Sequence, residues 1–143
     1  MESKIRSQVL ICTGVVTTAV LLLIPICVPA FGWWRTHGSL DGSLAEPEER
    51  GFYLLYLVFT YGIHLPLVAS VWLFVHTARR CALRTAIFMY LVTLSGMALS
   101  AYYFRSSLGY PLVRYIPAFS YVFVVLPLLS YSLVTSVRTS RNK

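Results

Sequence analysis

Few side chains of this 143-residue chain suit acid–base chemistry, and the acidic ones all precede Arg50. The acidic residues are Glu2, Asp41, Glu46, Glu48 and Glu49, and no carboxylate follows Arg50. General acid–base catalysis needs a proton donor and a proton acceptor held at the reacting atoms. This lack of carboxylates limits the chemistry of the larger part of the chain, and we assign no catalytic residue from the sequence.

His64 is the most informative ionisable residue of that acid-free part. It lies near the middle of an apolar stretch and is followed by Leu65-Pro66. An ionisable group inside an apolar span is by default a functional-site hypothesis. Two interpretations remain open: a neutral imidazole bonded to a neighbouring helix, and an imidazole that faces a ligand. His76 is twelve positions further on, about 18 Å along a helix, so the two cannot share a haem iron, and we expect no metal or cofactor.

Hydroxyl groups accompany His64 in apolar surroundings: Thr60, Thr93, Ser95, Ser100, Ser120 and Tyr121. Each can bond back to its own helix. A neutral imidazole that faced lipid would leave its N–H unsatisfied, so His64 is expected to turn inward. We predict a mostly apolar cavity between the second, third and fourth spans, with its polar contacts drawn from His64, Thr60, Thr93, Ser100 and Ser120.

The composition excludes most protein classes. Hydrophobic residues make up 57% of the chain and charged residues 12%, and the mean hydropathy is +0.70. Soluble domains carry about 25% charged residues, so a soluble enzyme, a disordered chain and a coiled coil are excluded. The formal net charge is +7, but the basic residues flank apolar runs, as in membrane proteins. We therefore do not expect a nucleic-acid partner.

Four apolar stretches are long enough to cross a bilayer as helices, because about 20 residues span its core. They cover residues of about 8–33, 52–77, 82–104 and 111–134. The short connections make neighbouring helices antiparallel, which predicts a single all-α domain: a four-helix transmembrane bundle. Five prolines predict kinks in three of the helices: Pro25, Pro29, Pro66, Pro117 and Pro127.

The remaining sizeable segment is an outer loop at 35–51, in which Glu46-Pro47-Glu48-Glu49 is typical of the start of a short helix. The first stretch resembles a signal peptide with a candidate cleavage site at Val28-Pro29-Ala30. Because that stretch is long enough to span a bilayer, we expect a retained signal-anchor helix.

Lys and Arg indicate the orientation. Eight lie on one side of the predicted bundle: Lys4, Arg6, Arg79, Arg80, Arg84, Arg138, Arg141 and Lys143. Four lie on the other: Arg35, Arg50, Arg105 and Arg114. The positive-inside rule then places both termini in the cytoplasm or its organellar equivalent. Four acids share the second side, so we expect Arg105 or Arg114 to lie near Glu46, Glu48 or Glu49.

The three cysteines do not form a thiol-redox motif. Cys12 and Cys27 are separated by about 22 Å on a single helix, which is too far for a disulfide. Cys81 follows Arg79-Arg80 at a predicted membrane edge. Palmitoylation of Cys81 and a plain interfacial cysteine both remain open.

Residues 60–137 resemble the EXPERA group of membrane proteins. Leu65-Pro66 followed by Leu83-Arg84-Thr85-Ala86-Ile87 resembles a stretch of the sigma-2 receptor. Tyr110-Pro111-Leu112 and the later Val124-Val125-Leu126-Pro127 resemble the last span of the emopamil-binding sterol isomerase. The resemblance implies a bundle of membrane helices around a pocket for sterols and cationic amphiphiles.

The chain departs from that group at the pocket. The group's intramembrane carboxylates fall, in our alignment, at Thr60 and Ser100, with Phe31 opposite the acid of the first span. Sterol isomerisation needs both an acid and a base, and the spans offer His64 alone. The resemblance thus implies the fold more than the activity.

Three functions remain open. The first is a non-catalytic protein of the endoplasmic reticulum that binds a membrane lipid or sterol. The second is an accessory subunit of a larger complex, with other membrane protein subunits as partners and the mitochondrial inner membrane as one location; small size and an Arg-rich, acid-poor chain favour it. The third is a sterol-modifying enzyme that uses His64.

Overall fold

The computed structural model describes residues 2–37, 47–80, 82–107 and 115–141, and these ranges are almost wholly helical, with no strand. The elements are α1 (Glu2–His37), α2 (Pro47–Arg79), α3 (Leu83–Ser107), α4 (Ile116–Ser120), a π-helix η2 (Tyr121–Val125) and α5 (Leu126–Arg141). The last three follow one another without a break and act as a single fourth helix.

Four helical stretches are long and apolar enough to cross a membrane: Lys4–Val28, Leu54–Arg79, Leu83–Arg105 and Ile116–Arg138. This confirms the predicted all-α bundle of four potential transmembrane helices, and the composition indicates an integral, multi-pass membrane protein. The predicted start of the fourth span, at residue 111, lies outside the described residues.

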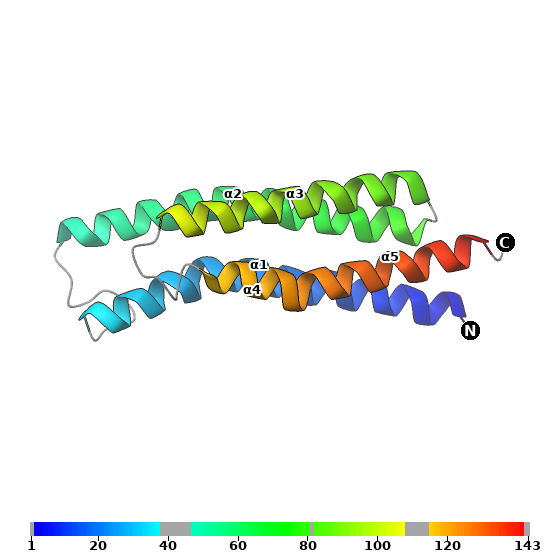
Figure 1. Ribbon diagram of the computed structural model, residues 1–143, viewed down its shortest axis with the longest axis horizontal. Helices are drawn as coiled ribbons and strands as arrows, with labels where there is room; N and C mark the ends of the chain where they lie inside the picture. Colours follow the sequence, from blue (N-terminus) through cyan, green and yellow to red (C-terminus); the bar gives the residue numbers. More distant parts are fainter. Residues whose placement is uncertain (1, 38–46, 81, 108–114, 142–143) are drawn as a thin grey trace.

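The helices form two pairs that run along a common long axis (Figure 1). The helices α2 and α3 lie side by side, and α1 lies beside the continuous α4–η2–α5 helix. The pairs pack on each other mainly through α1 against α2 and through α3 against α5. Both termini lie at the same end of the bundle, which confirms that they share a side. The compartment that this side faces stays a prediction.

The first two helices are longer than the apolar stretches that predict them. The 36 residues of α1 measure about 54 Å, at 1.5 Å per residue, against a hydrocarbon core of about 30 Å. The short helix expected in the 35–51 loop is instead the first turn of α2, which begins at Pro47. Proline at the first helical position is pre-organised for a helix, and extending a helix avoids the unfavourable step of nucleating a new one.

Among the described helices, one irregularity accompanies a proline, and it lies in the fourth helix. The helix α2 runs unbroken through Pro66, whereas the fourth helix widens into η2 just before Pro127. There the Leu126 N–H donates to the Tyr121 carbonyl, five residues back. Pro127 has no N–H, and its ring conflicts with the carbonyl four residues earlier, which accounts for a wider turn at this point.

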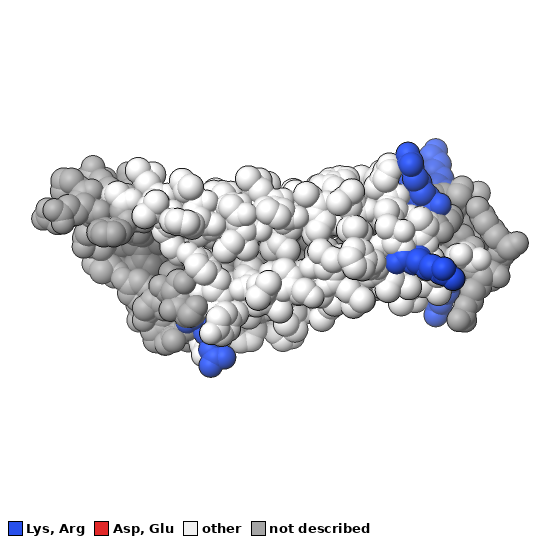
Figure 2. Space-filling model, turned by 90° about the horizontal axis from the view of Figure 1, so that it is seen from above, with Lys and Arg blue, Asp and Glu red and all other residues white. Residues whose placement is uncertain are grey.

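The outer surface is apolar along most of its length. Large side chains such as Phe123 (71% exposed), Val58 (69%) and Leu99 (69%) point away from the bundle. Contiguous exposed apolar surface is unfavourable in water but suits a hydrocarbon environment. Basic side chains gather towards the two ends of the molecule (Figure 2), most of them at the end that carries the termini.

Two predictions for the membrane edges fall outside the described residues. Arg114, Glu46 and Cys81 are not described, nor are the side chains of Glu48 and Glu49. The pairing of Arg105 or Arg114 with these acids and the lipidation of Cys81 therefore stay predictions. Cys12 and Cys27 are free and exposed, as their separation predicts.

Candidate functional site

His64 faces the interior of the bundle and is completely buried. Its Nδ1 lies 2.7 Å from the backbone carbonyl oxygen of Thr60, one turn earlier on α2. A carbonyl oxygen can only accept a hydrogen bond, so Nδ1 carries the proton and donates. The neutral imidazole is therefore fixed in one tautomer, with Nε2 as a hydrogen-bond acceptor.

Two hydroxyl groups from other helices meet this acceptor. The Tyr121 phenol oxygen on η2 lies 2.9 Å from Nε2, and Ser100 Oγ on α3 lies 3.3 Å from it. The two oxygens are 3.0 Å apart. In the arrangement with the shorter distances, Ser100 donates to Tyr121 and Tyr121 donates to His64. We call His64, Ser100, Tyr121 and the Thr60 carbonyl the His64 cluster; it ties together α2, α3 and the fourth helix.

An aromatic side chain completes the enclosure of the imidazole. The ring of Phe104, on α3, lies edge to face with the His64 ring at a centroid distance of 5.7 Å. Phe104 is itself completely buried, as is Ser100. The imidazole is thus surrounded by protein on all sides, with hydrogen bonds at both of its nitrogens.

The predicted site residues fall into different places. Ser100 joins His64 as predicted, and Thr60 does so through its carbonyl, while its hydroxyl donates to the Tyr56 carbonyl at 2.7 Å. The hydroxyl of Thr93 instead lies 2.9 Å from the hydroxyl of Ser70, at another position of the same α2–α3 interface. Ser120 is only half-buried, because the residue before Tyr121 points about 100° away from it around the helix.

Tyr121 is the residue whose importance the sequence did not single out. Its hydroxyl stood among several in apolar spans, with no carboxylate or proline adjacent to mark it. The available signal was Pro127, six residues further along the chain. A proline disturbs the helical turn before it, and one form of such a disturbance, the π-turn, is frequent at functional sites. The structure places Tyr121 at the first position of η2.

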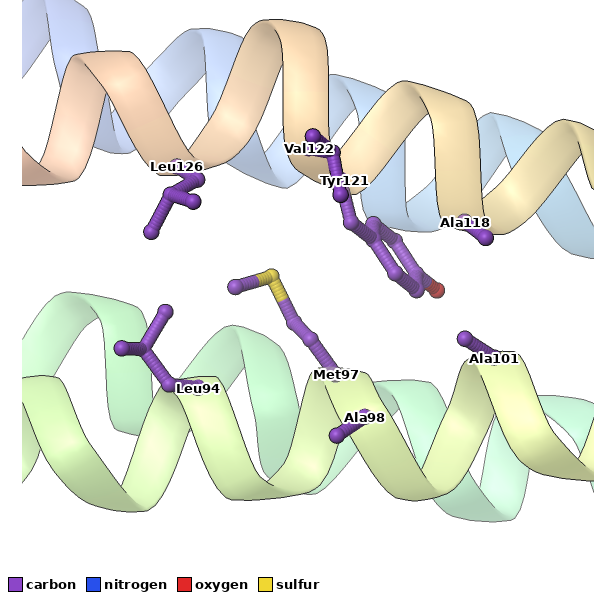
Figure 3. Close-up of a pocket in the computed structure, with 8 residues that line it drawn as sticks. All are labelled: Leu94, Met97, Ala98, Ala101, Ala118, Tyr121, Val122 and Leu126. Atoms are coloured by element: carbon purple, nitrogen blue, oxygen red, sulfur yellow. The ribbon is translucent and has the colours of Figure 1, made fainter.

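An apolar groove runs between α3 and the fourth helix (Figure 3). Its volume is about 180 Å³. Its walls are Leu94, Met97, Ala98 and Ala101 on α3, and Ala118, Tyr121, Val122 and Leu126 on the fourth helix. Ala98 and Val122 are exposed, so the groove opens on the outer surface. The Tyr121 ring crosses the space between the helices, and its hydroxyl points to the interior.

This groove does not lie where the cavity was predicted. It was expected between the second, third and fourth spans with His64 in its wall, but neither α2 nor His64 lines it. The helices α2 and α3 approach each other closely there, and a Cβ added at Gly96 would overlap with Leu67 Cδ2. Side chains fill that interface, and Tyr121 stands between the groove and the imidazole.

Other polar pairs cross the bundle at different depths. Thr13 and Ser132 join α1 to α5, with their hydroxyl oxygens 2.8 Å apart, and Tyr90 and Ser130 join α3 to α5 at 2.8 Å. Such bonds between helices are a usual means of association in lipid. Among the residues that the structure describes, no group of three His, Cys, Asp or Glu side chains could hold a metal ion.

Comparisons with known proteins give no relative: no family model, no curated protein and no solved structure matches the chain.

Proposed function

We propose that this chain is a non-catalytic, multi-pass membrane protein that holds part of a neutral lipid or sterol in the groove beside Tyr121. The observation that carries the proposal is the apolar groove itself, open on a surface suited to hydrocarbon. Because a bilayer would surround this surface, the molecules at hand to fill the groove are acyl chains and sterol rings.

The size of the groove limits what it holds. Sites that enclose a whole small molecule measure about 300–1,000 Å³, whereas this groove measures about 180 Å³. An apolar cavity of about 150 Å³ is known to hold benzene. The groove therefore takes a segment of a ligand, such as a stretch of chain or one edge of a ring system, and the rest lies along the outer face.

The chemistry of the walls favours a neutral ligand. The eight lining residues carry no charge, and the Tyr121 hydroxyl is their one polar side-chain group. A cationic amphiphile would enter without a carboxylate to pair with, and burying an unpaired charge is strongly unfavourable.

The His64 cluster supports a structural part for the imidazole in this proposal. Both ring nitrogens are already hydrogen-bonded, and Phe104 covers one side of the ring. A catalytic base would need its free nitrogen in contact with the reacting atom. We therefore propose that His64 holds Tyr121 in place as the inner wall of the groove.

The resemblance to the EXPERA group is part of the same proposal. Thr60 and Ser100, which align with that group's carboxylates, both contact His64, as residues at corresponding pocket positions would. Phe31, aligned with the remaining acid, is instead exposed near the far end of α1. The endoplasmic reticulum is the membrane that we propose on this basis.

Photolabelling tests the proposal directly. The purified full chain would be irradiated with a photoreactive sterol and, separately, a photoreactive diacylglycerol, and the labelled peptides mapped. Ala98→Phe fills the mouth of the groove, while Ala69→Phe adds the same bulk at an exposed position on α2. We expect Ala98→Phe to lower labelling of α3 and the fourth helix several-fold, and Ala69→Phe to leave it unchanged.

Two outcomes would reject this function. Equal labelling of both variants would mean that the probes only sample the outer surface. A chain that is stable only within a large assembly, with the groove covered by another subunit, would favour the accessory-subunit alternative and with it the mitochondrial inner membrane as a candidate location.

A further inference from the structure

The end of the bundle that carries both termini is strongly basic. The Lys and Arg residues whose side chains are described there are Lys4, Arg6, Arg79, Arg80, Arg84 and Arg138. Basic side chains gather near this end on the face shown in Figure 2. All but Arg6 are exposed. In the three sequence segments that meet at this end, residues 1–10, 76–86 and 134–143, Glu2 is the only acidic side chain.

Arg6 differs from the others because it acts within the bundle. Its Nη2 donates to the Ala78 carbonyl in the last turn of α2, one of the carbonyls that a helix end leaves without a helical partner. It also lies beside Leu83, Ala86, Ser136 and Ser140. Arg6 thus anchors α1 to the α2–α3 connection and fixes the positions of the exposed arginines around it.

Three of those exposed arginines lie within six residues of chain. The helix α2 ends at Arg79, and Arg80 follows it directly. Arg84 lies in the first turn of α3, a turn without any acidic side chain. A basic group in the first turn opposes the helix dipole, and like charges this close repel one another. Since no described carboxylate offsets them, an external anion would relieve both effects.

The type of basic residue is itself informative. The chain has ten arginines and two lysines, although Lys and Arg count equally in setting membrane orientation. The planar guanidinium forms paired hydrogen bonds to phosphate, whereas an ammonium acts as a point charge. The three basic residues at the α2–α3 connection are all arginines, the residue type that suits phosphate.

We infer that this basic end binds the phosphate headgroups of anionic phospholipids, through Arg79, Arg80 and Arg84 at the α2–α3 connection. The surface lies where a leaflet's headgroups would meet the helix ends, and clusters of basic residues beside transmembrane helices attract anionic lipid. This site is independent of the groove, which lies between α3 and the fourth helix further along the bundle.

The test uses the purified full chain and native mass spectrometry. The protein would be equilibrated in detergent with phosphatidylglycerol, with phosphatidylinositol 4-phosphate, or with phosphatidylcholine as the neutral lipid, and the retained lipid counted. We expect selective retention of the two anionic lipids. Replacing all three arginines with Gln should lower it roughly tenfold or more, given the contribution of each basic residue near a charged surface. Arg105→Gln, an exposed position at the opposite end, should leave it unchanged.

A second variant separates specific phosphate contacts from charge alone. Replacing the same three arginines with Lys keeps the charge and the orientation signal, and it should still lower retention several-fold, because the paired hydrogen bonds are lost. Retention equal to that of the parent chain in the Lys variant would overturn the inference, as would equal retention of phosphatidylcholine. Inorganic phosphate added as a competitor shows whether the arginines bind a lipid headgroup or soluble phosphate. A lipid site should retain its lipid in the presence of the competitor. Displacement of the lipid by inorganic phosphate at a concentration equal to that of the lipid would mean that the arginines bind soluble phosphate instead.

Discussion

Tyr121 and His64 are joined by a hydrogen bond, with 2.9 Å between the phenol oxygen and Nε2. Tyr121 also forms the inner wall of the groove. The same side chain therefore belongs to a sealed polar cluster and to an open apolar surface. Any movement of its ring would change both at once, which makes Tyr121 the most informative position in the chain.

Replacing Tyr121 with Phe removes that hydrogen bond and keeps the ring. In this variant the remaining hydrogen-bond partner of His64 Nε2 is Ser100 Oγ, at the longer distance of 3.3 Å. Weakening the bonding of a buried polar group costs about 1–3 kcal/mol, so we expect the free energy of unfolding to fall by about this amount. Chemical denaturation in detergent measures it. Tyr131→Phe, at a position 59% exposed, is the control and should change stability by less than about 0.5 kcal/mol. Similar losses in the two variants would contradict the cluster.

His64→Leu separates the structural role of the imidazole from a ligand-binding role. Ser100 and Tyr121 can still bond to each other at 3.0 Å, but the link to α2 is lost, and we expect a loss of stability of about 1–3 kcal/mol. Sterol photolabelling should fall in proportion to the loss of folded protein. Lost labelling with full stability would show instead that His64 is needed for ligand binding itself, by direct contact or by positioning Tyr121. If neither quantity changed, His64 would have no important role.

The tautomer of His64 is a separate prediction. Because the Thr60 carbonyl can only accept, the proton must reside on Nδ1. Nitrogen chemical shifts of the labelled histidine, recorded on the reconstituted protein, distinguish the two tautomers. A protonated Nε2 would require the opposite direction for the bond to Tyr121, and it would leave the 2.7 Å contact at Nδ1 without a hydrogen.

The sequence predicts the architecture because hydropathy and the Lys and Arg distribution act over whole spans. Four apolar runs of the right length can satisfy their backbone groups in lipid only as helices, and short connections leave little choice of topology. The ends of α1 and α2 were missed because helical residues beyond the bilayer carry no hydropathy signal. Pro47 and the acids around it indicated a helix start, but not that the helix would continue into the span.

The site was only partly predictable, for a geometric reason. The high energy of an unsatisfied imidazole in lipid was enough to turn His64 inward. Which hydroxyl meets it depends on the rotation of the fourth helix, and a π-turn inserts one residue and rotates the rest of the helix by about 100°. Nothing in the sequence decides whether Pro127 produces a kink or the observed widening at η2. The groove has the same origin, since it depends on how closely α3 packs against that helix.

Thr17 and Thr13 provide a matched pair of buried hydroxyls on α1. Thr17 is completely buried, and its Oγ1 has no hydrogen-bond partner among the described residues. Thr13 bonds to Ser132 on α5. Thr17→Val removes an unsatisfied polar group at nearly constant volume, so it should leave stability unchanged or raise it by about 1 kcal/mol. Thr13→Val should lower stability by roughly 0.6–1.7 kcal/mol, as for other hydrogen bonds between membrane helices. Unfolding of both variants under the same conditions checks the contrast, and the reverse order would contradict the assigned bond.

Gly96 and Gly62 predict opposite effects of the same substitution. Gly96 faces α2, and an added Cβ would overlap with Leu67 Cδ2. Leu67 is 5% exposed, so it has little room to move, and overpacking of this kind costs about 1–3 kcal/mol. Gly62 has no atom within 4 Å of its added Cβ, and Ala there should stabilise α2 by up to about 1 kcal/mol through helix propensity alone.

Gly96→Ala should therefore lower the unfolding midpoint and Gly62→Ala should maintain or raise it. Adding Leu67→Ala to the Gly96 variant makes space for the new methyl group, and the double variant should be more stable than the sum of the two single effects predicts. Additive behaviour would mean that α2 and α3 do not meet through these residues. The close contact between α2 and α3 at Gly96 would then be wrong.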